Sequence, residues 1–313
     1  GFEMSEVSNK LSTIVFNDIL KNNRTYRYPI NKQDFLVSRF CNGHPKDGTN
    51  LEDLVIKVVS PLDSHYDSFS HEQACIEHSL KDNGSVLIKL GEDQRLWDDL
   101  TVFIKTDRFL FQNSGQRPEQ EHLLREKQME NMAREKRLKV GFEALFAQAS
   151  VYAIGTKMPK KSVTPSVIVE ESYKYIVENT FAKLNLLNVT PGEVLPELQK
   201  VLVADNVAQL GLDLQADECN PDATREVEQY VSFRIERNEP VYLSDIVTHF
   251  GKRPYGWPVN EILLLVARLG LAGKLAFSLQ GSDLALNRAY EPFNSVRKRG
   301  DIRVNKIRQV NDS

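Results

Sequence analysis

The segment Gly155-Thr156-Lys157-Met158-Pro159-Lys160-Lys161-Ser162 comes nearest to a phosphate-binding loop in this sequence. A Walker A loop needs a glycine directly before its lysine, so that backbone N–H groups can surround the phosphates. Lys160 stands at that place here, and Pro159 removes one more N–H donor. We therefore predict a basic surface loop, no Walker A nucleotide site and no catalysis by this chain.

A second group of residues has the types that bind zinc. His71, Cys75 and His78 recur at spacings of four and three, which places them on one face of a helix. The only other close pair of such residues is Cys41 and His44, and the spacing matches no established zinc signature. We therefore expect no metal site, with Cys75 facing the core and the two histidines at its edge.

Basic residues that could contact DNA phosphates gather near the C-terminus. The candidates are Lys252, Arg253, Arg268, Arg297, Lys298, Arg299, Arg303, Lys306 and Arg308. However, the helix expected over 258–269 offers only Asn260, Glu261 and Arg268 as long or polar side chains. Reading bases in the major groove usually takes several such groups. The pattern therefore leaves two roles open, a protein adaptor and a DNA-binding module without sequence specificity.

Tyr255 and Trp257 are candidates for contact with a partner. Large aromatic side chains anchor interfaces or stack on bases. More often they are buried in their own domain, so we favour a role in closing the corner between two helices.

Composition bounds the class of protein. A chain of 313 residues, with 41% hydrophobic and 27% charged residues, predicts two or three globular domains. The net charge of −3 means that nucleic-acid affinity would require a local basic patch. No apolar run reaches transmembrane length and no signal peptide is recognisable. Three widely spaced cysteines indicate reduced thiols and a cytoplasmic location.

The elements around the basic and aromatic candidates follow one order. A short helix that Ser244 could cap ends at Gly251, and Pro258 suits the first position of a second helix. Two short strands are expected over 274–279 and 284–287. Helix, turn, helix and hairpin is the order of a winged helix-turn-helix, a fold that binds DNA or proteins.

The rest of the sequence predicts an α+β chain of several domains. Buried strands are expected over 54–59 and 85–90, with helices after 70 and over 96–111. In chain order the expected parts are a small α/β domain over 1–115, a long charged helix over 116–150, a helical segment with a short hairpin over 151–220, a winged-helix domain over 221–295 and a basic tail over 296–313.

The long charged helix carries an apolar stripe in its second half only. The stripe consists of Leu138, Phe142, Leu145 and Ala149, whereas the first half is nearly all polar. An apolar repeat long enough to define a coiled coil is absent. A coiled-coil arm and a solvated linker helix therefore both remain open.

Several segments give the whole chain a resemblance to a known family. They are 58–66, 86–90, 96–100, 105–109, 175–184 and 253–257. In these segments the chain resembles a region downstream of the ATPase module in the large P-loop protein of BREX bacteriophage-defence systems, the BrxC/PglY type. The resemblance implies a cytoplasmic prokaryotic protein whose complete form binds ATP and Mg²⁺ and acts with a complex that methylates host DNA and blocks phage. Because the Walker A loop is missing, no ATP-site residue carries over and we expect no cofactor in this chain.

Three functions follow from these observations. The first is a non-catalytic assembly and regulatory region of a BREX ATPase, which contacts other BREX proteins and not a membrane. The second is a winged-helix module that binds double-stranded DNA without sequence specificity. The third is a standalone enzyme of unknown reaction, although the acidic residues are scattered and form no recognisable catalytic motif. Self-association through the long helix remains open.

Overall fold

The computed structural model describes residues 4–21, 24–48, 52–81, 84–113, 121–188, 192–204 and 220–307. The chain forms two compact units. The first comprises residues 1–28 and 34–179, and the second comprises residues 29–33 and 180–313. The mixed α+β fold class expected from the sequence is confirmed, because each unit combines helices with a sheet.

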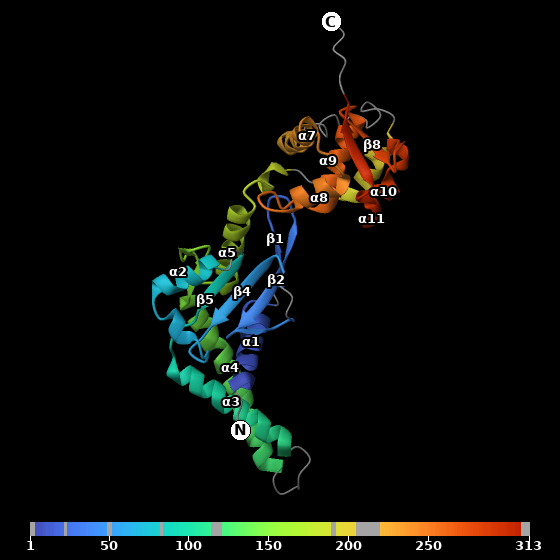
Figure 1. Ribbon diagram of the computed structural model, residues 1–313. Helices are drawn as coiled ribbons and strands as arrows, with labels where there is room; N and C mark the ends of the chain where they lie inside the picture. Colours follow the sequence, from blue (N-terminus) through green and yellow to red (C-terminus); the bar gives the residue numbers. More distant parts are fainter. Residues whose placement is uncertain are drawn as a thin grey trace. The chain divides into compact units, whose positions relative to one another are not determined.

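A mixed sheet forms the centre of the first unit (Figure 1). Its strands are β1 Thr25–Arg27, β2 Asp34–Cys41, β3 His44–Pro45, β4 Leu54–Val59, β5 Ser85–Lys89, β6 Ser150–Ala153 and β7 Thr156–Lys157. The order is β1-β2-β4-β5-β6-β7, with β3 beside β2. β2, β4 and β5 run parallel, and the flanking pairs are antiparallel. The two strands expected from β-branched runs, β4 and β5, lie at the centre, where strands buried on both faces belong.

Helices cover the two faces of this sheet unequally. The helices are α1 Met4–Thr13, η1 Ile14–Ile19, η2 Tyr66–Phe69, α2 Glu72–Lys81, α3 Gln94–Asn113, α4 Glu121–Gln148 and α5 Pro165–Thr180. η1 packs on the face that carries Arg39, whose guanidinium lies over the Phe16 ring. α2 covers part of the opposite face, with Cys75 beside Val59 and Leu87. The sequence did not predict α1 and η1, although their apolar side chains are buried.

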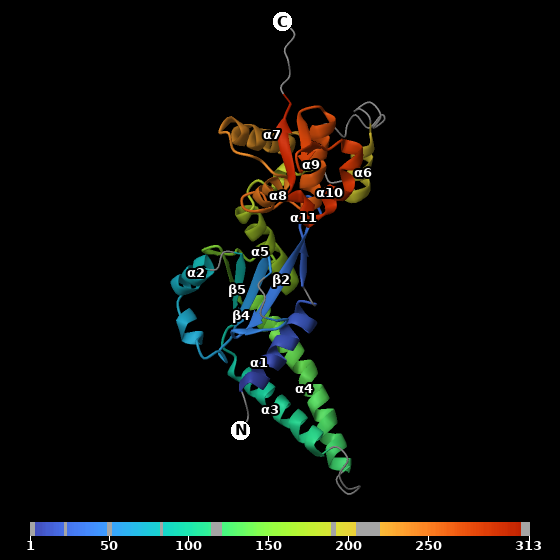
Figure 2. The ribbon, with the colours of Figure 1, turned by 45° about the vertical axis from the view of Figure 1, so that its right-hand side comes forward.

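α3 and α4 form an antiparallel hairpin. Trp97 packs on Phe142 with ring centroids 5.1 Å apart, and the Arg134 Nε lies 3.0 Å from an Asp99 oxygen. None of the first ten residues of α4 is buried, whereas Leu138, Phe142 and Phe146 are. Both views show the far end of α3 and the start of α4 extending past the sheet (Figures 1 and 2). The long charged helix thus packs on a helix of its own chain.

The second unit is a winged helix with an additional helix, and this element of the predicted fold is also confirmed. Its elements are η4 Leu184–Leu186, α6 Val194–Val203, α7 Pro221–Glu236, α8 Leu243–Gly251, α9 Val259–Leu271, β8 Leu275–Leu279, β9 Ser282–Asp283, η7 Leu286–Arg288, α10 Tyr290–Asn294, α11 Val296–Arg299 and β10 Ile302–Lys306. The sheet has the order β10-β8-β9, and Tyr242 forms an isolated bridge to Arg303.

The wing hairpin forms, but its second strand, β9, is shorter and begins two residues earlier than expected. Residues 284–287 form no strand, and the main partner of β8 is β10, which belongs to the segment that the sequence assigned to a basic tail. In β10 the buried Ile302 and Val304 alternate with the exposed Arg303. This period of two specifies a half-buried strand, but the surrounding cations conceal it in the sequence.

Two helix starts also differ from the expectation. Ser244 lies inside α8, and the Tyr242 N–H donates instead to the Asp245 carboxylate over 2.9 Å. Pro258 is the residue that precedes α9, not the first residue of the helix. Its fixed φ of −61° and extended ψ of 143° direct the chain into the helix from one position earlier.

Candidate interaction site

α9 occupies the place of the helix that a DNA-binding winged helix inserts into the major groove. Its buried residues are Glu261, Ile262, Leu263, Leu264, Leu265, Val266, Ala267 and Leu269. Successive residues of a helix are about 100° apart, so seven consecutive buried positions surround the axis. α6, α7, α8 and β8 all pack on this helix. A helix that is buried all round has no face to offer to DNA.

The predicted DNA contact Arg268 points to a carboxylate of its own unit. Its side chain is 12% exposed, and its Nη2 lies 3.8 Å from an oxygen of Glu197 on α6. Glu261, about two turns earlier on the same side of α9, is 4% exposed. Burial raises the pKa of Glu261 to about 7, against the opposing charge of Arg268. Arg268 therefore interacts with carboxylates of its own unit, Glu197 and Glu261, and is mostly buried.

Tyr255 and Trp257, the predicted partner contacts, lie in a buried aromatic cluster. Trp257 stacks on Phe250 with centroids 4.9 Å apart and an interplanar angle of 6°. Its Nε1 donates to the Lys183 carbonyl over 3.1 Å. The Tyr255 hydroxyl donates to Glu226 over 2.6 Å. The two rings thus close the corner between α7, α8 and the connection to α9. The sequence analysis favoured this role over contact with a partner.

The cluster is held by an ion pair at its edge. The Lys183 Nζ lies 2.8 Å from Glu226, and this hydrogen bond raises the pKa of Lys183. Burial alone would raise the pKa of Glu226, but the hydrogen bonds from Lys183 and Tyr255 outweigh it and lower that pKa. Glu226 is therefore ionised at neutral pH.

A groove of about 380 Å³ runs between α7, α8 and the loop after α8. Its lining residues are Tyr230, Arg234, Ser244, Asp245, Thr248, His249, Lys252 and Arg253. Lys252 and Arg253 are exposed, and no carboxylate among the described residues lies within ion-pair distance of either. Burial, with Arg234 as the next cause, lowers the pKa of His249. At neutral pH the groove therefore offers two unpaired cations beside a neutral imidazole, which suits an anionic partner group.

Some of the C-terminal cations make contacts within the unit, whereas others are exposed and have no ion pair among the described residues. The Lys298 Nζ lies 2.8 Å from Glu291, and Arg299 donates to the Phe293 and Asn294 carbonyls over 2.6 and 3.3 Å. The exposed group, which has no ion pair within the described part of the chain, consists of Arg297, Arg303 and Lys306. α8 packs against both α11 and β10. Arg308 lies outside the described residues.

The residues considered for zinc are separated by their surroundings. The buried Cys75 donates its Sγ–H to the Phe69 carbonyl over 3.4 Å, and burial raises the pKa of this thiol. The His78 ring packs on Phe69 with centroids 4.6 Å apart, and His71 is exposed. Over the described ranges, no group of three or more His, Cys, Asp or Glu side chains could hold a metal ion. A protonated thiol is also a poor ligand.

The segment 155–162 does not have the geometry of a phosphate loop. Gly155 is the turn of the β6–β7 hairpin, with φ +68°, and the chain continues as a strand and a loop instead of a helix. Lys157 is paired with Glu72, and Lys160 donates to the Gln148 carbonyl over 2.5 Å. This segment therefore lacks the strand–loop–helix arrangement in which backbone N–H groups surround a phosphate.

The sequence predicts helices in the region of α6, but two packing contacts of the second unit could not be predicted from it. α6 covers α9 through Leu198, Val201 and Leu202, whose spacing of three and one was a usable signal for a buried helix face. The turn residue Gln33 also belongs to this unit, where its Nε2 donates to the Gly256 carbonyl over 3.0 Å. No local pattern could show that second contact. Among the described residues, no helix is long and apolar enough to span a bilayer.

Comparison with known proteins gives two family matches that together cover most of the chain. Residues 2–176 match the family described as BREX ATP-binding protein BrxC 4th domain with six-stranded beta sheet. Residues 183–308 match the family described as BREX ATP-binding protein BrxC winged helix-turn-helix domain. No solved structure matches the chain.

Proposed function

We propose that this chain, which belongs to the BrxC family of BREX ATP-binding proteins, is a non-catalytic region for assembly and regulation. In this role it contacts other BREX proteins and transmits changes between them and the ATPase module. We also propose that ATP and Mg²⁺ bind the complete protein elsewhere, since the segment 155–162 begins in the β6–β7 hairpin and continues as a loop, unlike a phosphate-binding loop.

The observation that carries this proposal is the burial of α9. A winged helix that reads DNA must present this helix to the major groove. Here seven consecutive residues of α9 are buried, and α6 packs against it. The fold therefore favours use as an adaptor, in which other surfaces of the unit contact proteins.

The α7–α8 groove is the surface that we assign to such a contact. Lys252 and Arg253 are exposed at its end, and Tyr230 stacks on His249 with centroids 4.2 Å apart. Arginine and aromatic side chains are enriched in protein interfaces, and Arg253 and Tyr230 supply both kinds here. A partner with an acidic side chain next to an apolar one would match this groove.

The experiment is binding of the chain to each purified protein of the same BREX system, measured by biolayer interferometry. We expect at least one protein to bind, and K252E/R253E to weaken that binding tenfold or more. Arg297→Glu is the matched control, because this exposed cation lies on α11, outside the groove lining. Absence of binding to every BREX protein would refute the assembly role.

Binding to DNA without sequence specificity is the second candidate function. The observation in its favour is that five of the predicted DNA contacts are exposed and have no ion pair among the described residues, namely Lys252, Arg253, Arg297, Arg303 and Lys306. Fluorescence anisotropy with a short duplex, titrated over roughly 50 to 200 mM salt, measures such phosphate contacts. If DNA binds, each lost contact lowers the salt slope by about 1. A duplex that stays unbound at low salt excludes this candidate for the chain.

A further inference from the structure

The far half of the α3–α4 hairpin, which we call the arm, comprises residues 99–113 of α3 and 121–135 of α4. Polar contacts fix its base. The Asn131 Nδ2 donates to the Phe103 carbonyl over 3.1 Å, and Arg134 is paired with Asp99 and Glu130 at 3.0 Å. Asn131 and Arg134 are buried, and Arg134 reaches from the interface between the helices to two carboxylates that are partly exposed. The arm is therefore a preformed pair of helices.

Beyond this base the two helices leave an open groove of about 560 Å³. Its apolar lining consists of Phe103, Leu110, Phe111, Leu124 and Met132. The groove has a cause in the sequence. Positions 124, 128, 131, 135, 138 and 142 follow the spacing of three and four that faces a neighbouring helix, but Gln128, Asn131 and Glu135 are polar. The seam between the helices is consequently not filled by apolar side chains at the arm.

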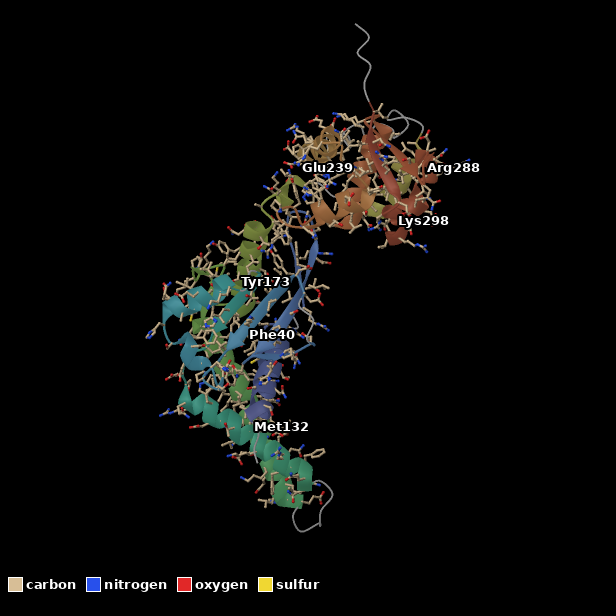
Figure 3. All side chains as sticks on the ribbon, viewed as in Figure 1. Phe40, Met132, Tyr173, Glu239, Arg288 and Lys298 are labelled. Carbon is tan, nitrogen blue, oxygen red and sulfur yellow. The ribbon has the colours of Figure 1, made fainter. Side chains whose placement is uncertain are left out.

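Large apolar side chains also project beyond the groove. Phe111 is 81% exposed, Met129 72% and Met132 57%, and Met132 lies on the part of the hairpin that extends past the sheet (Figure 3). A small molecule in the groove would leave most of this surface in water. Phe111 and Met132 line the same groove, exposed apolar surface of this kind indicates a macromolecular partner, and methionine adapts to the shape of such partners.

The dimensions of the arm suit one short helix. Phe103 and Phe111 are eight residues apart, which corresponds to about 12 Å along α3. This length accommodates about two turns of a partner helix, with apolar residues at spacings of three and four in the groove. A peptide helix would add a third member to the pair.

The charges that line the groove favour a partner with a positively charged residue. Glu121 is paired with Arg125 at 2.9 Å, and Glu135 with Lys10 at 2.8 Å. Asp107 lines the same groove, is exposed and has no ion-pair partner within the described ranges. One negative charge thus stays uncompensated in the middle of an apolar lining, and a lysine or arginine of the partner would neutralise it.

We propose that the arm binds an amphipathic helix of another protein, with its apolar face on Phe111 and Met132 and a basic residue opposite Asp107. This inference rests on the assembly role proposed above and names the class of partner for a second surface. A second copy of the chain is the competing occupant.

The test uses the full chain and two synthetic helical peptides with the same leucine face, one with lysines and one with glutamates along its edges. We expect the lysine peptide to bind more tightly than the glutamate peptide by tenfold or more. F111Q/M132Q should lower its affinity at least tenfold, and Asp107→Lys should reverse the preference. Val140→Gln is the matched control, because Val140 is 69% exposed on α4, the helix that carries Met132, but lies outside the groove lining.

Three outcomes overturn this proposal. They are equal binding of both peptides, affinity unchanged in F111Q/M132Q, and a dimer of the chain that sedimentation shows to dissociate in F111Q/M132Q. The last result would assign the groove to a second copy. Failure of the BREX-protein binding experiment alone would instead refute the assembly role and leave the peptide result standing.

Discussion

At the scale of single residues, Glu261 has the environment with the clearest consequence. It is a carboxylate inside the apolar surroundings of α9, and burial raises its pKa from 4.5 to about 7. The folded chain therefore holds a proton there that the unfolded chain releases at lower pH. The resulting contribution to the free energy of unfolding is fully present below pH 4.5, decreases as the pH rises toward 7 and is lost above it.

We predict that Glu261→Gln removes this pH dependence. Between pH 5 and 8 the free energy of unfolding of the second unit should fall by about 2 to 3 kcal/mol more in the parent than in the variant. Denaturant unfolding followed by Trp257 fluorescence in a Trp97→Phe background measures the difference. Glu291→Gln, at a carboxylate that is 71% exposed, is the control. An equal difference at both pH values would show that Glu261 does not titrate in this range.

The residue scale also shows what a sequence can reveal about a site. Residue type and position identified Tyr255 and Trp257 as candidates. A large aromatic side chain suits a partner contact and a buried helix corner equally well, so the sequence alone could not distinguish the two roles. The choice depends on Phe250 and on the Lys183 carbonyl, 74 positions away from Trp257. Arg268 is a similar case, since only the position of α6 brings Glu197 to it.

At the scale of elements, local patterns located the helices and strands with strong periodicity. β4 and β5 stand out as β-branched runs, and α3 covers the helix that was expected over 96–111. β10 was missed, because the six cations of the segment 297–308 outweigh the two apolar residues that set its inward face. Strand pairing with β8 decides its structure, and that pairing is not a local property.

We predict that β10 is essential for the second unit although its segment is basic. Val304 is 1% exposed opposite Phe277, so Val304→Asp would bury an unpaired carboxylate. We expect this variant to lose the cooperative thermal transition of the unit or to lower its midpoint by more than about 8 °C. Arg303→Ala, on the outward face of the same strand, should change the free energy of unfolding by no more than about 0.5 kcal/mol.

Equal melting of both variants and the parent would contradict this assignment of β10. The prediction also bears on the DNA question, because deletion of the basic C-terminal segment would remove a strand of the fold. Substitution of Arg297, Arg303 and Lys306 is the cleaner test of phosphate contacts, since these side chains are exposed.

At the scale of the whole molecule, the five parts expected along the sequence group into two units. Changes in charge along a chain suggest boundaries, but packing follows the apolar faces that meet. α4 pairs with α3 through Trp97 and Phe142, so the charged helix belongs to the first unit. Residues 29–33 belong to the second unit although their neighbours in sequence form β1 and β2. Such non-local membership cannot be inferred from composition or periodicity.

Because each unit has its own core, we predict that each unfolds by its own transition. The two tryptophans report on them separately, since Trp97 packs on Phe142 in the first unit and Trp257 on Phe250 in the second. In a Trp257→Phe background, Phe142→Ala should destabilise the transition seen by Trp97 by about 3 to 5 kcal/mol. In a Trp97→Phe background, Phe142→Ala should leave the Trp257 transition unchanged, whereas Phe250→Ala should destabilise it by a similar amount. Parallel shifts of both reporters with either variant would show instead that the two cores unfold together, and that a partner bound to one unit stabilises both.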